Sequence, residues 1–182
     1  MKTRILSLVL MAAFSLSSYA QKISTRNGYI KFFSETSVEN IKAENNQVSS
    51  VIDLETGQFA FLVQIKAFQF EKALMQEHFN ENYMESGKYP KASFKGNIAG
   101  FEKLDLSKDG KYEVNFEGTM TIHGTDRTIS EPATIMVKGG EISLTSSFNL
   151  SPEEYGVEIP ASKRDNIAES LEITVKMNYD KK

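Results

Sequence analysis

Histidine is the side chain with the widest chemical range in this sequence, and the chain has two, His78 and His123. His123 stands in a polar segment with Gly124 and Asp126. An imidazole in such a place could act as a general base, bond to the head group of a ligand or contact a metal ion. The alternative is a turn histidine whose ring bonds to neighbouring backbone groups, and the polar, glycine-containing surroundings favour that interpretation.

The other groups that could do chemistry form no recognisable constellation. A zinc site needs three or four converging ligands, and the sequence offers His78 as a second imidazole and no cysteine. No metalloprotease, nucleophile-elbow or phosphate-loop motif occurs. Glu153 and Glu154 suit the first turn of a short helix, while Glu113 and Glu117 fall on the polar face of a strand. We therefore predict no catalytic residue, no metal and no cofactor.

The element that leads to His123 is the most regular stretch of the chain. Between Tyr112 and Ile122, apolar or small residues alternate strictly with polar ones. A period of two predicts a strand with one buried face. The alternation stops at residues 123–126, which predicts a tight turn, and a second strand is expected from Arg127 to Lys138. Pro132 within that strand suggests an edge position or a bulge.

The same alternation recurs along most of the chain. A turn is expected at Asn45-Asn46 and another at Gly139-Gly140. Between Phe70 and Glu85 the apolar residues recur at helical spacing instead, which predicts one inserted amphipathic helix. Residues 151–154 (SPEE) predict a short helical turn that begins with a capping box. The remaining strands are expected over residues 28–35, 38–44, 47–53, 58–67, 91–98, 142–150 and 171–179.

Strands that share one apolar face must close that face onto something, either as an up-and-down barrel or as a two-sheet sandwich. The hairpin turns, the single helix and the lack of βαβ spacing favour a mainly β, antiparallel barrel. An eight-stranded barrel is just wide enough to hold one small ligand.

The amino terminus predicts export. Lys2 and Arg4 precede an apolar run from Ile5 to Leu16, and Ser18-Tyr-Ala20 offers small residues for cleavage. Residues 1–20 are therefore predicted to be a cleaved signal peptide, too short to span a bilayer, and residues 21–182 a single domain. Export without cysteine indicates a periplasmic or secreted protein. The net charge of −3 argues against nucleic acid as a partner.

Three segments then resemble, in the right order, the YceI-like family. Residues 121–127 (TIHGTDR) resemble its strand-His-Gly-turn signature. Residues 78–94 resemble its helix, Tyr-Pro and strand entry, and residues 148–157 its late strand and glycine-containing loop. The resemblance covers nearly all of residues 21–182. It implies an extended, lipocalin-like barrel around an apolar tunnel, which in some members holds a polyisoprenoid or another long-chain amphiphile. No catalytic activity is established for the family as a whole.

Such a ligand needs an apolar lining more than reactive groups. Each buried methylene contributes about 0.8 kcal/mol, so about ten of them outweigh one hydrogen bond of about 1 kcal/mol. The candidate ligand-binding residues are the inward-facing side chains of the strands and helix, with His123 as a head-group contact. They are Phe61, Val63, Met75, Phe79, Phe94, Ile98, Phe116, Met120, His123, Leu144, Phe148, Ile173 and Val175. Each of the apolar ones could instead fill a dry core.

The predicted function is thus a periplasmic carrier for a long apolar molecule such as an isoprenoid or another lipid. Two alternatives stay open. One is a lipid-directed hydrolase or isomerase that uses His123 as its general base. The other is a ligand-free interaction module whose exposed edge at Pro132 meets a partner. A homodimer is also left open.

Overall fold

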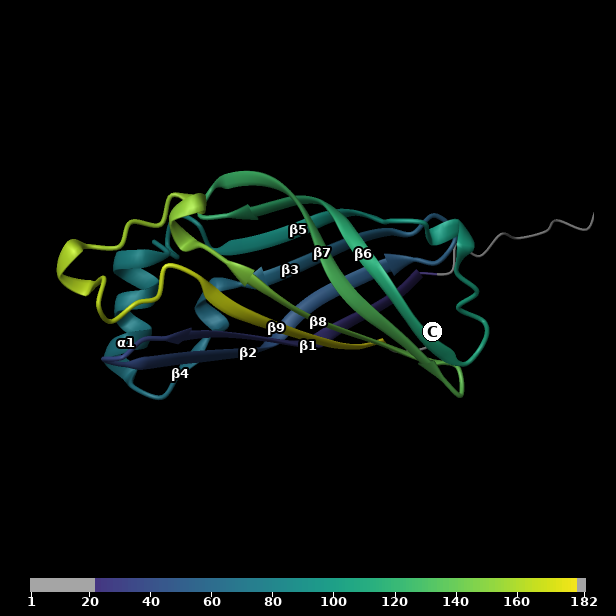
Figure 1. Cartoon of the computed structure of the whole chain (residues 1–182), viewed down its shortest axis with the longest axis horizontal. Coiled ribbons are helices and arrows are strands. Elements are labelled where there is room, and N and C mark those ends of the chain that lie inside the picture. Colours follow the sequence, from purple (N-terminus) through teal and green to yellow (C-terminus); the bar gives the residue numbers. More distant parts are fainter. Residues whose placement is uncertain (1–21, 180–182) are drawn as a thin grey trace, which may run out of the picture.

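The computed structural model describes residues 22–179, which form a long barrel with a helix across one end (Figure 1). The predicted signal peptide lies outside these residues. The strands in the described part are β1 (Lys22–Glu35), β2 (Asn40–Asp53), β3 (Gln58–Gln64), β4 (Gln69–Phe70), β5 (Lys91–Ile98), β6 (Gly110–Ile122), β7 (Thr125–Lys138), β8 (Glu141–Leu150) and β9 (Leu171–Tyr179). Short 3₁₀ turns occur at Ile65–Ala67, Phe101–Lys103, Pro152–Tyr155 and Ala161–Lys163.

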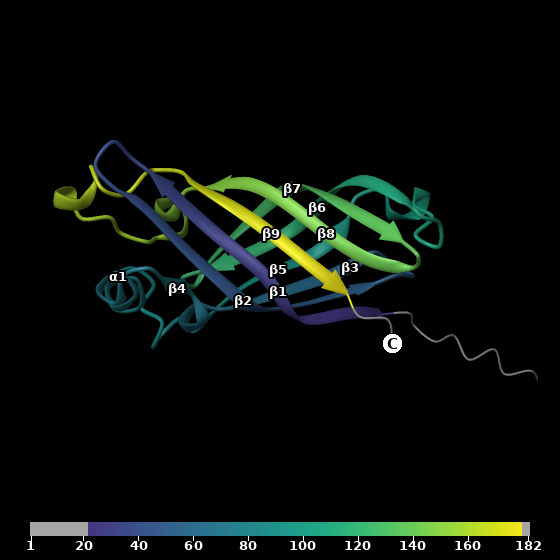
Figure 2. The same cartoon turned by 90° about the horizontal axis from the view of Figure 1, so that it is seen from below.

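Eight of these strands close on themselves. Their order is β1-β9-β8-β7-β6-β5-β3-β2, and β2 pairs with β1 again, every pairing being antiparallel. The two-residue β4 adds to the edge of β2. Figure 2 shows the strands wrapping obliquely around a common axis. The sheet therefore closes into a ring of strands, which confirms the predicted mainly β, antiparallel barrel.

The β6–β7 hairpin matches the sequence prediction closely. The two strands pair along their whole length, from Gly110 opposite Val137 to Ile122 opposite Thr125. Only His123 and Gly124 lie between them, with φ angles of 50° and 74°. Positive φ at both loop residues defines the type I′ geometry, whose twist suits a two-residue hairpin. The turn is therefore two residues long and not four, and β7 begins at Thr125.

The predicted turn at Asn45-Asn46 was wrong, because β2 continues through it. Asn45 pairs with Ile30 of β1, and its side chain is fully buried. Its Nδ2 donates to the carbonyl of Gln64 at 2.9 Å, and its Oδ1 accepts from the Gln47 amide at 2.8 Å. The pairing with β1 is irregular on both sides of Gly28: β1 carries one extra residue between Thr25 and Gly28, and β2 carries one between Asn45 and Val48. Tertiary hydrogen bonds thus override the local turn preference of asparagine.

The predicted helix is present, with two kinds of winding along its length. Helix α1 spans Ala73–His78 and continues as a π-helical segment, Phe79–Tyr83. The helix therefore changes its winding at Phe79 without a break. The predicted helical turn is present as the 3₁₀ turn Pro152–Tyr155, but the prediction of a capping box was wrong, because Ser151 makes no side-chain cap hydrogen bond to it.

The end of the barrel opposite the helix is solidly packed. Its interior is filled by buried side chains from six strands: Ile52, Ile98, Val114, Ile135, Ile142 and Tyr179. The hydroxyls of Tyr179 and Ser50 lie 2.8 Å apart there, and burial raises the pKa of Tyr179. Any cavity inside the barrel must therefore lie between these side chains and the helical end.

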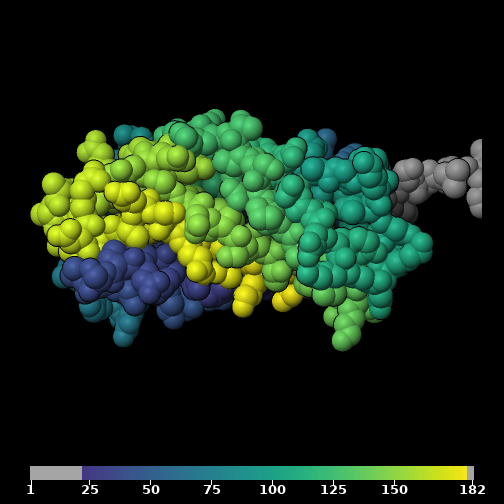
Figure 3. Space-filling model, viewed as in Figure 1, coloured from purple at the N-terminus to yellow at the C-terminus, as the bar shows by residue number. Residues whose placement is uncertain are grey.

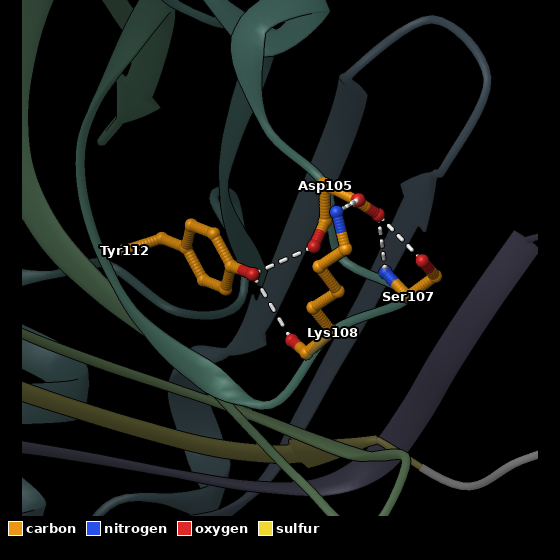
Figure 4. A network of polar contacts seen from close by, with 4 residues as sticks. All are labelled: Asp105, Ser107, Lys108 and Tyr112. Atoms are coloured by element: carbon orange, nitrogen blue, oxygen red, sulfur yellow. Dashed lines mark hydrogen bonds and ion pairs between the residues drawn. The ribbon is translucent and has the colours of Figure 1, made fainter.

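A polar network closes the loop outside that packed end (Figure 4). The Tyr112 hydroxyl lies 2.6 Å from the carbonyl oxygen of Asp105 and 3.0 Å from that of Lys108. The carboxylate of Asp105 pairs with the Lys108 ammonium at 2.7 Å and accepts a bond from Ser107. These contacts lower the pKa of Asp105 to about 2.

Candidate functional site

A cavity of about 470 Å³ occupies the helical half of the barrel. It is lined by side chains from the eight barrel strands, β4, helix α1, the π-helical segment and the loop formed by residues 151–170, and most of them are apolar. Well-packed interiors leave few voids larger than a water molecule, so a space of this size is a candidate binding site. Its volume falls within the range of about 300–1,000 Å³ that is typical of small-molecule pockets.

Most of the residues predicted from the sequence to contact a ligand lie in this lining. Eleven of the thirteen candidate residues line the cavity. They are Phe61, Val63, Met75, Phe79, Phe94, Phe116, Met120, Leu144, Phe148, Ile173 and Val175. Met75 and Phe79 come from the helix, as expected, and Phe79 stacks on Phe32 with ring centroids 5.5 Å apart.

Ile98 does not line the cavity. It is inward-facing and only 3% exposed, but it belongs to the packed end of the barrel. Alternation along a strand shows which face a side chain occupies, whereas its level along the barrel axis depends on strand tilt and register.

His123 also lies outside the cavity lining. Its Nε2 is 2.9 Å from Oε2 of Glu85, and its ring meets the Tyr89 ring edge-on at 4.4 Å. Gly124 packs against the same tyrosine, because an added Cβ would lie 2.6 Å from Tyr89 Cε1. The signature turn therefore ties the segment after the helix to the β6–β7 hairpin. It is held by side chains and not, as the sequence suggested, by backbone groups.

Many of the lining residues were not predicted from the sequence. Among them are Ile30, Phe32, Val48, Phe68, Phe70 and Met177. Phe32 gathers Phe68, Phe70 and Phe79 around it at 5.4–5.7 Å between ring centroids. The irregular pairing of β1 and β2 hides the alternation around Phe32, and Phe68 and Phe70 lie in a short segment without a period. In the sequence, Phe68 and Phe70 stand out only by their aromatic character.

The cavity reaches the surface at the helical end. Leu74 of α1 is part of the lining and is 60% exposed. Two contacts hold the rim together: Lys72 Nζ lies 2.8 Å from Glu39 Oε1, and the Ala168 amide donates to Ser34 Oγ at 2.9 Å. The space-filling view shows the β1–β2 turn, in blue, packed against the yellow loop of residues 151–170 (Figure 3).

The described residues offer little for other chemistries. Within residues 22–179, no group of three or more His, Cys, Asp or Glu side chains is placed to hold a metal ion. Over the same range, no helix is long and apolar enough to cross a membrane.

Solved structures with the same architecture come from several bacteria. A polyisoprenoid-binding domain from Saccharophagus degradans superposes with a TM-score of 0.75 at 12% identity, covering 90% of this chain and 99% of that domain. BcnA of Burkholderia cenocepacia gives 0.68 at 15% identity, covering 82% and 94%. A YCEI protein of Campylobacter jejuni gives 0.63 at 16% identity, covering 81% and 90%. At these identities the likeness is one of fold.

The sequence comparison identifies the family. None of the curated proteins matches the chain significantly. The sequence model of the YceI-like domain, in contrast, matches residues 15–179, which is nearly the whole chain and includes every element of the barrel. Together with the shared fold, this match shows that the chain belongs to the YceI-like domain family.

Proposed function

We propose that this protein binds one long apolar molecule, a polyisoprenoid or another lipid-like amphiphile, inside the barrel and carries it through the periplasm. The observation that carries the proposal is the apolar cavity of about 470 Å³, which is open at the helical end and blocked at the other. An empty cavity loses dispersion contacts along its whole lining, and an apolar chain would restore them. The relative from Saccharophagus degradans, described as polyisoprenoid-binding, supports this class of ligand by analogy.

Blocking the cavity tests the proposal. Ala133 lies on the inward face of β7 in the cavity lining and is 8% exposed. In Ala133→Phe the added ring would occupy space that the ligand needs. We expect at least a tenfold loss of affinity for a fluorescent long-chain probe, since several methylene contacts of about 0.8 kcal/mol each are lost.

The matched control is Met136→Phe, which places the same side chain on the exposed, outward face of β7. It should bind the probe like the wild type. If Ala133→Phe folds and binds the probe with unchanged affinity, the ligand does not occupy this cavity.

The periplasmic location in this proposal rests on the predicted signal peptide. Osmotic-shock fractionation checks it, and the expected result is a mature protein that begins after Ala20 and appears in the shock fluid. Retention in the spheroplasts would contradict it.

A hydrolase or isomerase that acts on a lipid is the second candidate, and one contact favours it. Glu85 lies within hydrogen-bond distance of His123, as an acid partner of a general base must. However, neither residue lines the cavity. We therefore expect wild type and His123→Ala to leave a long-chain ester intact at the same background rate. Turnover that requires His123 would favour the enzyme.

A further inference from the structure

Four residues with formally charged side chains line the apolar cavity: Glu39, Lys72, Lys163 and Glu131. The first two pair with each other at the rim. Lys163 is exposed and belongs to the 3₁₀ turn Ala161–Lys163 in the rim loop. Glu131 differs from all three, because it comes from the middle of a barrel strand, β7.

The register of β7 directs Glu131 inward. Its partner on β6 is Phe116, which is 3% exposed and lines the cavity. The next inward residue toward the packed end is Ala133, also buried and also lining. The carboxyl group therefore lies in the cavity wall beside the apolar side chains of Phe116 and Ala133.

Within residues 22–179, no side chain or backbone group pairs with this carboxylate. Among the described residues it makes no hydrogen bond and no ion pair. The cation on the same strand, Arg127, pairs instead with Glu154 at 3.3 Å. Burial raises the pKa of Glu131, as expected for a carboxyl group without a compensating partner.

The sheet forks where Glu131 stands. The β7–β8 pairing runs from Lys138 opposite Glu141 to Thr134 opposite Thr145 and stops there. Pro132 has no amide to donate, and its carbonyl accepts a hydrogen bond from Ser146 Oγ at 2.5 Å. Ser146 also lines the cavity. The two strands separate beyond this point, and the wall carries a small polar patch beside the fork.

We propose that Glu131 forms a polar subsite in the cavity wall that accepts a hydrogen bond from a hydroxyl, amine or amide group of an otherwise apolar ligand. The same carboxylate disfavours ligands that present a carboxylate or phosphate at this depth. This inference rests on the proposed function, because it names the class of polar group that the bound molecule carries.

Two physical arguments support this selectivity. An ionised carboxylate is an acceptor only, so it bonds to a donor and cannot bond to another anion. Glu131 is half-buried, and partial shielding from water makes both the unpaired acceptor and the repulsion between like charges more costly. A hydrogen bond to a charged group changes affinity by about tenfold to hundredfold. We expect ligands with a donor group to be preferred over anionic ligands by a factor of this size.

A chain-matched ligand series tests the proposal. Hexadecanol, hexadecylamine and palmitate share one apolar chain and differ only in the polar group. Their affinities are measured at neutral pH by displacement of a fluorescent probe, for wild type, Glu131→Gln and Glu117→Gln. Glu117 supplies the matched control, since it is an exposed glutamate on the outer face of β6.

The wild type should bind the alcohol and the amine at least about tenfold more tightly than palmitate. Glu131→Gln should raise the affinity for palmitate and lower that for the amine, each by about tenfold, whereas Glu117→Gln should behave like the wild type. Equal affinities for the three ligands in the wild type, or an unchanged ranking in Glu131→Gln, would overturn the subsite alone. If none of the three binds to any variant, the proposed function fails with it.

Discussion

Glu131 and Phe116 are cross-strand neighbours in the cavity wall, but they affect the stability of the fold in opposite directions. Phe116 contributes to stability through burial, whereas the carboxyl group of Glu131 gives up hydration without gaining a partner in the ligand-free protein. A stabilising substitution therefore exists at a position that we assign to ligand recognition.

The pH dependence of stability at Glu131 follows from its raised pKa. The unfolded chain has the ordinary value, so the folded state is penalised progressively as the pH rises from that value through the raised one. Glu131→Gln removes this penalty. In ligand-free protein, thermal unfolding followed by circular dichroism should show a higher midpoint for Glu131→Gln at pH 7 and no difference near pH 4. A variant that is less stable than wild type at pH 7 would contradict this account.

At the scale of single residues, the sequence predicted which side chains face inward better than what they do there. Phe94 and Ile98 lie on the same face of β5, yet one lines the cavity and the other packs the closed end. Glu131 was invisible for a different reason: in the sequence it lies beside Pro132, where the alternation is irregular. Its role emerges only from the register with β6 and the fork from β8.

The His123-Gly124 turn joins β6 to β7 and also contacts the segment that follows the helix. Gly124→Ala forces a side chain into positive φ and into Tyr89, since its Cβ would lie 2.6 Å from Cε1. Strain of this kind costs about 1–3 kcal/mol. The change should lower the free energy of unfolding by that amount or more, as measured by urea denaturation.

Gly139→Ala is the matched control for that experiment. Gly139 also has positive φ, at 57°, in a two-residue hairpin turn, but an added Cβ there meets no atom within 4 Å. It should show the backbone strain of about 1–2 kcal/mol without the clash. Equal losses for the two variants would mean that the contact with Tyr89 contributes nothing.

Elements with a clear period were predictable, and elements that depend on distant partners were not. Strands β5 and β6 were found within two residues of their bounds, because both alternate without interruption. Strand β2 was divided at Asn45-Asn46, since the tertiary bonds of Asn45 cannot be seen in a local pattern. Nine strands were predicted and nine are present in residues 22–179, but the division of β2 into two was offset by the short strand β4, which was not predicted.

The whole molecule divides into a packed end, which stabilises the fold, and a hollow end, which we assign to binding. Tyr179→Phe tests this division, because it leaves the buried Ser50 hydroxyl without its partner and lies outside the cavity lining. Stability should fall by about 1–3 kcal/mol, while probe affinity stays within twofold of wild type. Tyr112→Phe, which removes an exposed hydroxyl at the same end, should cost less. A large loss of affinity in Tyr179→Phe would show that the two ends are coupled.

The central claim is that the barrel holds one apolar molecule, and native mass spectrometry of the mature protein purified from cells tests it most directly. The account predicts a species heavier than the polypeptide by the mass of a single organic-extractable molecule. That species should be lost in Ala133→Phe and retained in Met136→Phe. A wild-type protein found only at the mass of its polypeptide, and still at that mass after incubation with long-chain isoprenoids and lipids, would contradict the account.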